Sequence, residues 1–195
     1  MSTFSEYYSN LLAWEEQPHQ ELIARWDTSH IAAIQEDFRS AVATSNIKEL
    51  LFVIREGSSS QSIGNQAEMF FVANVNSHLA KHEIALCSGP GYPDRMLRVK
   101  GSTAVFPFEV KATSKWNPLD SNRCVLTSSS EKLRRYFQKP ICHLLATISY
   151  VNTHPTRVTG VRLDSLQPDS KVNVRLEASV SQRLLSRGDH PWVQL

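Results

Sequence analysis

The chain has 195 residues, of which 41% are hydrophobic and 21% are charged, as in an ordinary globular protein with a core of its own. The net charge of +2 is too small to indicate nucleic-acid binding, so a partner of that kind has to be inferred from local clusters. Cys87, Cys124 and Cys142 are scattered without metal-binding spacing, and the sequence shows no signal peptide or membrane span. We therefore expect a reduced, cytoplasmic protein that does not associate with membranes.

Residues 1–57 predict a helical layer. Apolar side chains recur there at helical spacing in two groups, namely Phe4, Tyr7, Tyr8, Leu11 and Leu12, and then Ile31, Ile34 and Phe38. Asn46 followed by Glu49 predicts a capped helix that runs to Gly57. The serine-rich residues 58–62 are interpreted as a loop within one domain, so residues 1–195 are predicted to form a single domain.

A second amphipathic helix is predicted from Ser62 to His82. Its apolar stripe repeats every fourth residue, at Ala67, Phe71, Val75 and Leu79, and Glu68 lies beside that stripe. His78 and His82 would form an exposed polar pair on this helix, because no further ligands accompany them. A strand over residues 83–88 and a turn-rich segment over residues 89–93 then lead to Asp94.

The next segment predicts a β-hairpin. Residues 95–99 and 104–108 are interpreted as strands around a type II′ turn centred on Gly101 and Ser102. Counting outward from this turn places Asp94 opposite Glu109, with Cβ atoms about 4.5–5.5 Å apart. Two carboxylates at that distance can share one divalent ion.

The alternation of side chains along the hairpin predicts its two faces. The core face would carry Leu97, Val99, Ala104, Phe106, Phe108, Val110 and Ala112. Asp94, Glu109 and Lys111 fall on the opposite face, which we expect to be accessible and cationic. Pro107 lies where the ladder would need an N–H group, which predicts a bulge or an unpaired edge nearby.

Polar and basic residues after Lys111 predict a DNA-facing surface. They lie in a loop and in a helix whose capping box begins at Ser128, and the candidates are Ser114, Lys115, Asn117, Asn122, Arg123, Lys132, Arg134 and Arg135. Residues 141–151 predict a central strand buried on both faces, and residues 157–163 predict a strand that returns beside it. Residues 171–177 alternate and are expected to extend the sheet, so residues 157–195 would form a sheet extension and a C-terminal segment.

Asp94, preceded by Pro93 and followed later by Glu109, Val110 and Lys111, resembles the signature of the PD-(D/E)XK nuclease superfamily, whose best-known members are type II restriction endonucleases. The common core of that family runs helix, three strands, helix, strand, and residues 62–151 can be read in that order. The resemblance covers under half of the chain. It implies an α/β (α+β) fold with a restriction-endonuclease-like core, in which a mixed β-sheet is flanked by helices and joined to the N-terminal helical layer.

The resemblance also implies an activity, namely sequence-specific cleavage of double-stranded DNA by a Mg²⁺-dependent type II restriction enzyme. Asp94, Glu109 and the Val110 carbonyl would hold the metal, Lys111 would orient and activate the attacking water, and Glu68 would assist from the helix. The implied products carry 5′-phosphate and 3′-hydroxyl ends. Because one subunit carries one such set and two strands must be cut, we expect a homodimer, with its contact on residues 1–57.

Two alternatives remain open at this point. The chain can be another nuclease of the same superfamily, such as a junction resolvase, a repair enzyme or a homing endonuclease. It can also be a non-catalytic DNA-binding domain in which the acids of the hairpin are only surface groups.

Overall fold

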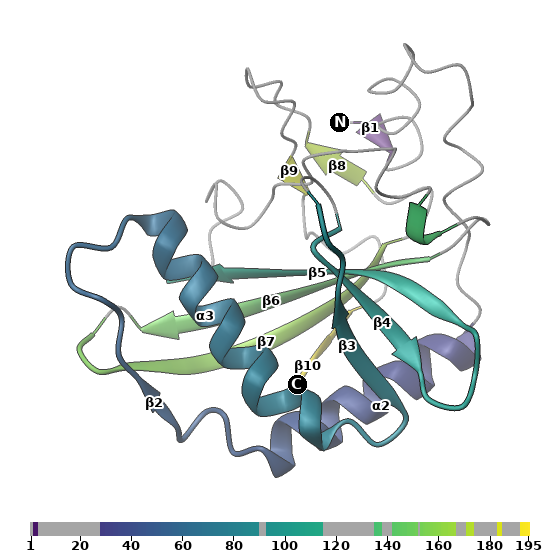
Figure 1. The fold of residues 1–195 in the computed structure, drawn as a ribbon, viewed down its shortest axis with the longest axis horizontal. Coiled ribbons are helices and arrows are strands. Elements are labelled where there is room, and N and C mark those ends of the chain that lie inside the picture. The colour runs from purple at the N-terminus through teal and green to yellow at the C-terminus, as the bar shows by residue number, and fades with distance from the viewer. Residues whose placement is uncertain are drawn as a thin grey trace.

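The computed structural model describes residues 2–3, 28–89, 93–114, 135–137, 142–151, 153–166, 171–173, 183–184 and 192–195. In this part of the chain, a curled mixed β-sheet packs with two α-helices (Figure 1). The predicted mixed α/β class is therefore confirmed at this level. None of the helices in these ranges is long and apolar enough to cross a membrane.

Helix α2 spans Thr28–Thr44 and buries its predicted stripe of Ile31, Ile34 and Phe38 in the core. These side chains are therefore not available as the dimer contact that we expected on residues 1–57. The aromatic group from Phe4 to Leu12, which belongs to the same expectation, lies outside the described residues.

The helix predicted from Asn46 to Gly57 is wrong. Asn46 adopts a φ of 50°, a left-handed conformation that ends a helix and does not begin one. The chain then forms strand β2, Leu51–Phe52, which pairs with Thr156 and Arg157. Leu51 and Phe52, from the apolar run after Asn46, thus join the sheet.

Helix α3 spans Ser60–Val75 and is capped by Ser59, whose side chain accepts a hydrogen bond from the Ser62 N–H group. The predicted stripe of Ala67, Phe71, Val75 and Leu79 is buried, which confirms it.

The predicted end of this helix at His82 is wrong. A 3-10 turn, η2 (Asn76–His78), follows α3, and the Asn76 side chain bonds both the N–H and the C=O group of Ile84 at 2.7 and 3.1 Å. This clamp turns the chain into the sheet after η2. His82 is consequently a buried residue of strand β3 and does not pair with the exposed His78.

The main sheet has the strand order β10-β7-β6-β5-β4-β3, with β2 paired to β7. The bounds are β3 His82–Leu86, β4 Arg95–Val99, β5 Val105–Thr113, β6 His143–Val151, β7 Thr156–Leu166 and β10 Trp192–Gln194. Strands β5 and β6 are parallel, and the other neighbouring pairs are antiparallel. The buried central strand predicted over residues 141–151 and its antiparallel return are confirmed by β6 and β7.

The predicted extension of this sheet by residues 171–177 is wrong. Strand β8, Lys171–Asn173, instead pairs with β1 (Ser2–Thr3) and β9 (Arg183–Leu184) in a separate three-stranded sheet. The main sheet is extended by β10, which pairs with β7. Residues 174–177 lie outside the described ranges.

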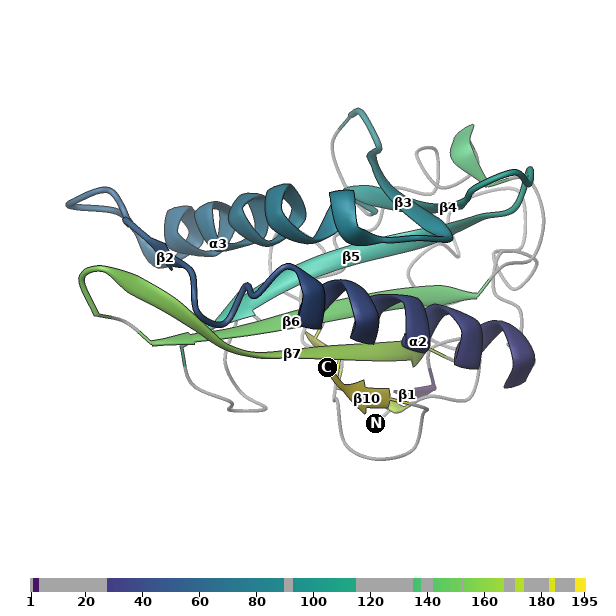
Figure 2. The same cartoon turned by 90° about the horizontal axis from the view of Figure 1, so that it is seen from below.

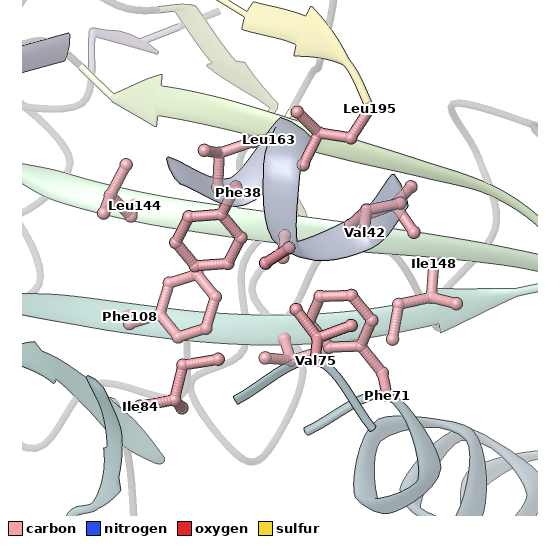
Figure 3. Packing of buried hydrophobic residues seen from close by; sticks show 14 of the residues in the cluster. Phe38, Val42, Phe71, Val75, Ile84, Phe108, Leu144, Ile148, Leu163 and Leu195 are labelled. Atoms are coloured by element: carbon pink, nitrogen blue, oxygen red, sulfur yellow. The ribbon is translucent and has the colours of Figure 1, made fainter. Parts of the chain in front are cut away.

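Both helices pack against the same face of the main sheet. Phe38 of α2 contacts Phe108 of β5, with ring centroids 5.6 Å apart, and Phe71 and Val75 of α3 join the same cluster (Figure 3). Figure 2 shows the two helices together over β5, β6 and β7. The core-face residues predicted for the hairpin, including Leu97, belong to or pack against this cluster, which confirms the face assignment.

The β4–β5 hairpin has the predicted register but not the predicted turn. Residues 95–98 pair with residues 108–105, which continues to Asp94 opposite Glu109. The turn is shifted by one residue, because the Ser102 N–H group donates to the Val99 carbonyl at 3.1 Å and Gly101 has a φ of 76°. This φ is that of the third residue of a type II turn.

The shifted turn also explains why the bulge predicted near Pro107 is wrong. The Val99 N–H group donates to the Ala104 carbonyl at 3.0 Å, so Val99 and Ala104 are a hydrogen-bonded pair. Such pairs alternate with non-hydrogen-bonded ones along an antiparallel ladder, and Pro107 opposite Met96 falls on a non-hydrogen-bonded position. No N–H group is needed there, and the pairing continues without a break.

Candidate functional site

The site forms where strand β5 leaves one neighbour for another. Val105 to Phe108 pair with β4, and Phe108 to Thr113 pair with β6. Asp94 immediately precedes β4, and Glu109 is the first residue of β5 beyond the ladder with β4. Asp94 and Glu109 therefore both lie at the fork where β4 separates from β5.

Direct contacts join the three residues predicted to carry the chemistry. The Asp94 N–H group donates to Glu109 Oε2 at 3.1 Å, and Lys111 Nζ donates to Glu109 Oε1. Glu109 and Lys111 are two residues apart on one strand and point to the same face. The structure thus brings Asp94, Glu109 and Lys111 together.

The expectation that this face is accessible holds only in part. Asp94 is exposed, but Glu109 is 2% exposed and the side chain of Lys111 is 19% exposed. Met96 and Pro107, on the same face, are also buried. Glu109 is thus the buried member of the site, Lys111 is partly buried, and Asp94 lies at the surface.

Burial and neighbouring charges shift the pKa values of Glu109 and Lys111. Burial and the neighbouring Asp94 carboxylate raise the pKa of Glu109, against the opposing effect of the Lys111 ammonium. Burial alone would lower the pKa of Lys111, but the carboxylates of Glu109, Asp94 and Glu68 outweigh it and raise that pKa. Lys111 is therefore protonated at neutral pH. A second cation near Glu109 and Asp94 would favour the ionised form of Glu109.

Glu68 lies close enough for its charge to act on Lys111, but its direct partner is another residue. Arg95 Nε donates to Glu68 Oε1 at 2.7 Å, and both side chains are 15% exposed. Glu68 is thus held at the side of the site by an ion pair between α3 and β4.

The remaining predicted residues are described only in part. Ser114 is exposed directly after β5, and Arg135 is exposed, with its guanidinium 4.0 Å from the position a Cβ atom would take on Gly89. Tyr136, beside Arg135, donates to or accepts from Ser88 Oγ at 2.7 Å, so this segment contacts the loop that leads to Asp94. Lys115, Asn117, Asn122, Arg123, Lys132 and Arg134 lie outside the described residues.

The available donors suit a hard divalent ion. Among the described residues, no group of three or more His, Cys, Asp or Glu side chains is placed to hold a metal. Asp94 and Glu109 nevertheless supply two adjacent carboxylates, and Mg²⁺ commonly takes one or two carboxylates and completes its shell with water. Burial, the largest cause, and the neighbouring Asp94 carboxylate raise the pKa of Glu109, and a bound cation would favour its ionised form. The Val110 side chain is buried, and its carbonyl remains a predicted ligand.

Sequence reasoning missed several polar residues near the site. Arg95 is one, although it breaks the apolar alternation of the hairpin's core face, which is a detectable signal. Thr147 on β6 and Arg162 on β7 lie in register with Lys111, and Arg162 donates to Asp164 Oδ1 at 2.7 and 2.9 Å. Thr147, Arg162 and Asp164 are all buried, so a row of polar residues continues from Lys111 across β6 and β7.

Glu109→Gln is expected to raise the melting temperature at neutral pH. The pKa of Glu109 is raised above its ordinary value of 4.5, so ionisation costs stability as the pH rises from below 4.5 through the folded-state pKa. Glutamine keeps an acceptor for Lys111 without that cost. Thermal melts of the metal-free proteins should coincide near pH 4 and diverge as the pH rises, each kcal/mol being worth about 2–4 °C. A variant that melts below wild type throughout would contradict this electrostatic account.

Compared with protein-family models, curated proteins and solved structures, the chain has no significant match in any of the three.

Proposed function

We propose that this protein is a Mg²⁺-dependent, sequence-specific endonuclease for double-stranded DNA, of the PD-(D/E)XK type and most similar in role to a type II restriction enzyme. The observation that carries the proposal is the direct contact of Glu109 with both Asp94 and Lys111 at the fork between β4 and β5. Two acids and one ammonium around one point match the needs of phosphodiester hydrolysis.

The order of the helices and strands supports the proposal of a restriction-endonuclease-like core. Helix α3 is followed by β3, β4, β5 and later β6, which is the family order of helix, three strands and final strand. The second helix of that core would fall between β5 and β6, where only residues 114, 135–137 and 142 are described. In this proposal Asp94 and Glu109 occupy the acidic positions of the signature, and Lys111 occupies the lysine position.

The residues have distinct roles in the proposed reaction. Asp94 and Glu109, with the Val110 carbonyl, would hold Mg²⁺, which when bound stabilises the negative charge that builds up on the scissile phosphate. Lys111 remains protonated, so it acts as a hydrogen-bond donor that orients the attacking water and as a positive charge near the phosphate. Attack by this water on phosphorus with release of the 3′ oxygen leaves 5′-phosphate and 3′-hydroxyl ends. A homodimer in which each subunit cuts one strand would complete the double-strand break.

Digestion of plasmid and phage DNA with Mg²⁺, followed by mapping of the ends, tests this function. The proposal predicts discrete fragments whose ends fall at one short sequence. Cleavage confined to branched DNA would replace the restriction role with that of a junction resolvase. DNA binding without any cleavage would favour a non-catalytic DNA-binding domain.

Glu68→Gln is expected to lower the cleavage rate by less than Asp94→Asn does. The Asp94 carboxylate is a proposed ligand of the metal, whereas Glu68 acts on the site from its pair with Arg95. Cleavage rates measured over a range of Mg²⁺ concentrations give the comparison. A wild-type cleavage rate for Glu68→Gln at every Mg²⁺ concentration would show that Glu68 has only a structural role on α3.

A further inference from the structure

Arg95 occupies an unusual position beside the site. It is the first residue of β4, directly after Asp94, and it pairs with Phe108, which is fully buried in the core. The alternation of the strand would favour an apolar residue here, as at Leu97. Arg95 instead reaches Glu68 on α3 at 2.7 Å, and both side chains are largely shielded from water.

The charges around the site are nearly balanced. Three acids, Glu68, Asp94 and Glu109, face two bases, Lys111 and Arg95. Glu68 helps to raise the pKa of Lys111, so its charge acts on the buried part of the site. Because Arg95 contacts Glu68 directly in a partly desolvated pair, it cancels much of the charge that Glu68 would otherwise add.

We propose that Arg95 is a positioning residue that holds Glu68 beside the site, balances its charge and thereby sets the affinity of Asp94 and Glu109 for a divalent cation. The inference rests on the proposed function, because it assumes a cation at these two carboxylates. Loss of Arg95 leaves Glu68 uncompensated and makes the site more negative. Loss of Glu68 leaves Arg95 uncompensated and makes the site more positive.

The test is binding of Mn²⁺ alone to the full chain without DNA, measured by the loss of the free-ion signal in electron paramagnetic resonance. Arg95→Gln should bind Mn²⁺ about three- to tenfold more tightly than wild type, and Glu68→Gln should bind it more weakly by a similar factor, as expected for one partly screened charge. The double variant should return to nearly the wild-type affinity. Arg95→Lys retains the charge and should also bind like wild type.

Arg98→Gln is the matched control. Arg98 lies on the same strand and is 4.0 Å from Glu83, in a pair whose side chains are both half exposed. Its removal should leave Mn²⁺ affinity unchanged, because solvent screens this pair. Thermal melts of each variant show whether it is folded, and Arg95→Lys together with Glu68→Gln tests the charge effect even where Arg95→Gln is unstable.

The outcomes separate the two proposals. Mn²⁺ binding by wild type that is lost in Asp94→Asn supports the metal site of the proposed function. Suppose that this site binds Mn²⁺, but folded Arg95→Gln binds it no more tightly than wild type, or Arg95→Lys behaves like Arg95→Gln. The proposed role of Arg95 is then wrong, and the metal site still stands. If wild type binds no Mn²⁺, the proposed metal site fails and the role of Arg95 fails with it.

Discussion

Asp94→Asn, Glu109→Gln and Lys111→Ala should each slow DNA cleavage by about 10²- to 10⁴-fold, the scale on which enzymes lose rate when a transition-state charge is removed. The three groups form one contact network at the fork of the sheet, where Glu109 bonds both of its neighbours. Lys111→Ala should slow the chemical step more than it weakens DNA binding, because its ammonium is needed mainly when negative charge grows on the phosphate. Single-turnover cleavage and gel shifts in Ca²⁺ separate the two effects.

Glu83→Gln provides the control for these acids. Glu83 lies on β3, beside β4, and its side chain is half exposed. Its replacement should leave the cleavage rate within about twofold of wild type, because a solvated charge away from the fork contributes little. A wild-type cleavage rate in any one of the three site variants would contradict the catalytic role proposed for that residue.

Asp37→Ala should destabilise the protein by about 3–5 kcal/mol, because it removes three hydrogen bonds to a carboxylate, each worth roughly 1.5–3 kcal/mol. Asp37 of α2 accepts hydrogen bonds from the N–H groups of Ala80 and Lys81 at 2.9 and 3.0 Å and from His82 Nδ1 at 2.7 Å. Both side chains of the Asp37–His82 pair are 4% exposed. This cluster fixes the start of β3, which leads to Asp94.

Urea unfolding measures the loss, and Glu36→Ala is its control. Glu36 is the neighbour of Asp37, and its exposed pair with Arg39 should contribute less than about 1 kcal/mol. A loss for Asp37→Ala no larger than that for Glu36→Ala would contradict the role of the cluster.

The Asp37–His82 pair also makes the stability of the protein depend on pH. Burial alone would raise the pKa of Asp37, but the hydrogen bonds from His82, Lys81 and Ala80 outweigh it and lower that pKa below 3.8. The stabilisation is therefore present above pH 3.8 and is lost as the pH falls through the folded-state pKa. The stability gap between wild type and Asp37→Ala should narrow over that acidic range.

Local patterns predicted the elements that position the site. In an antiparallel hairpin, the numbers of every two paired residues have the same sum. The turn is shifted by one residue, but this sum is the predicted one, so Asp94 still lies opposite Glu109. The apolar stripe of α3 and the buried strand β6 were predicted for the same reason, because their periodicity is strong over many residues.

Errors arose where tertiary contacts overrode a local signal. Asn46 and Glu49 carry a capping pattern, yet Asn46 takes a left-handed conformation and the next apolar residues pair with β7. The end of α3 is fixed by Asn76 bonding to Ile84, a contact that periodicity cannot show. The ion pair of Arg95 with Glu68 could not be predicted from periodicity, because the two residues are distant in sequence and meet only through the packing of α3.

The Mg²⁺ dependence of double-strand cleavage tests the central claim most directly. Wild type and Lys111→Ala, purified in the same way, are incubated with phage DNA in Mg²⁺, in Ca²⁺ and in a chelator, and the ends are sequenced. We predict discrete fragments with 5′-phosphate ends for wild type in Mg²⁺ alone and no fragments for Lys111→Ala. Equal cleavage by the two proteins, or wild-type cleavage that survives the chelator, would contradict a metal-dependent nuclease site at Asp94, Glu109 and Lys111.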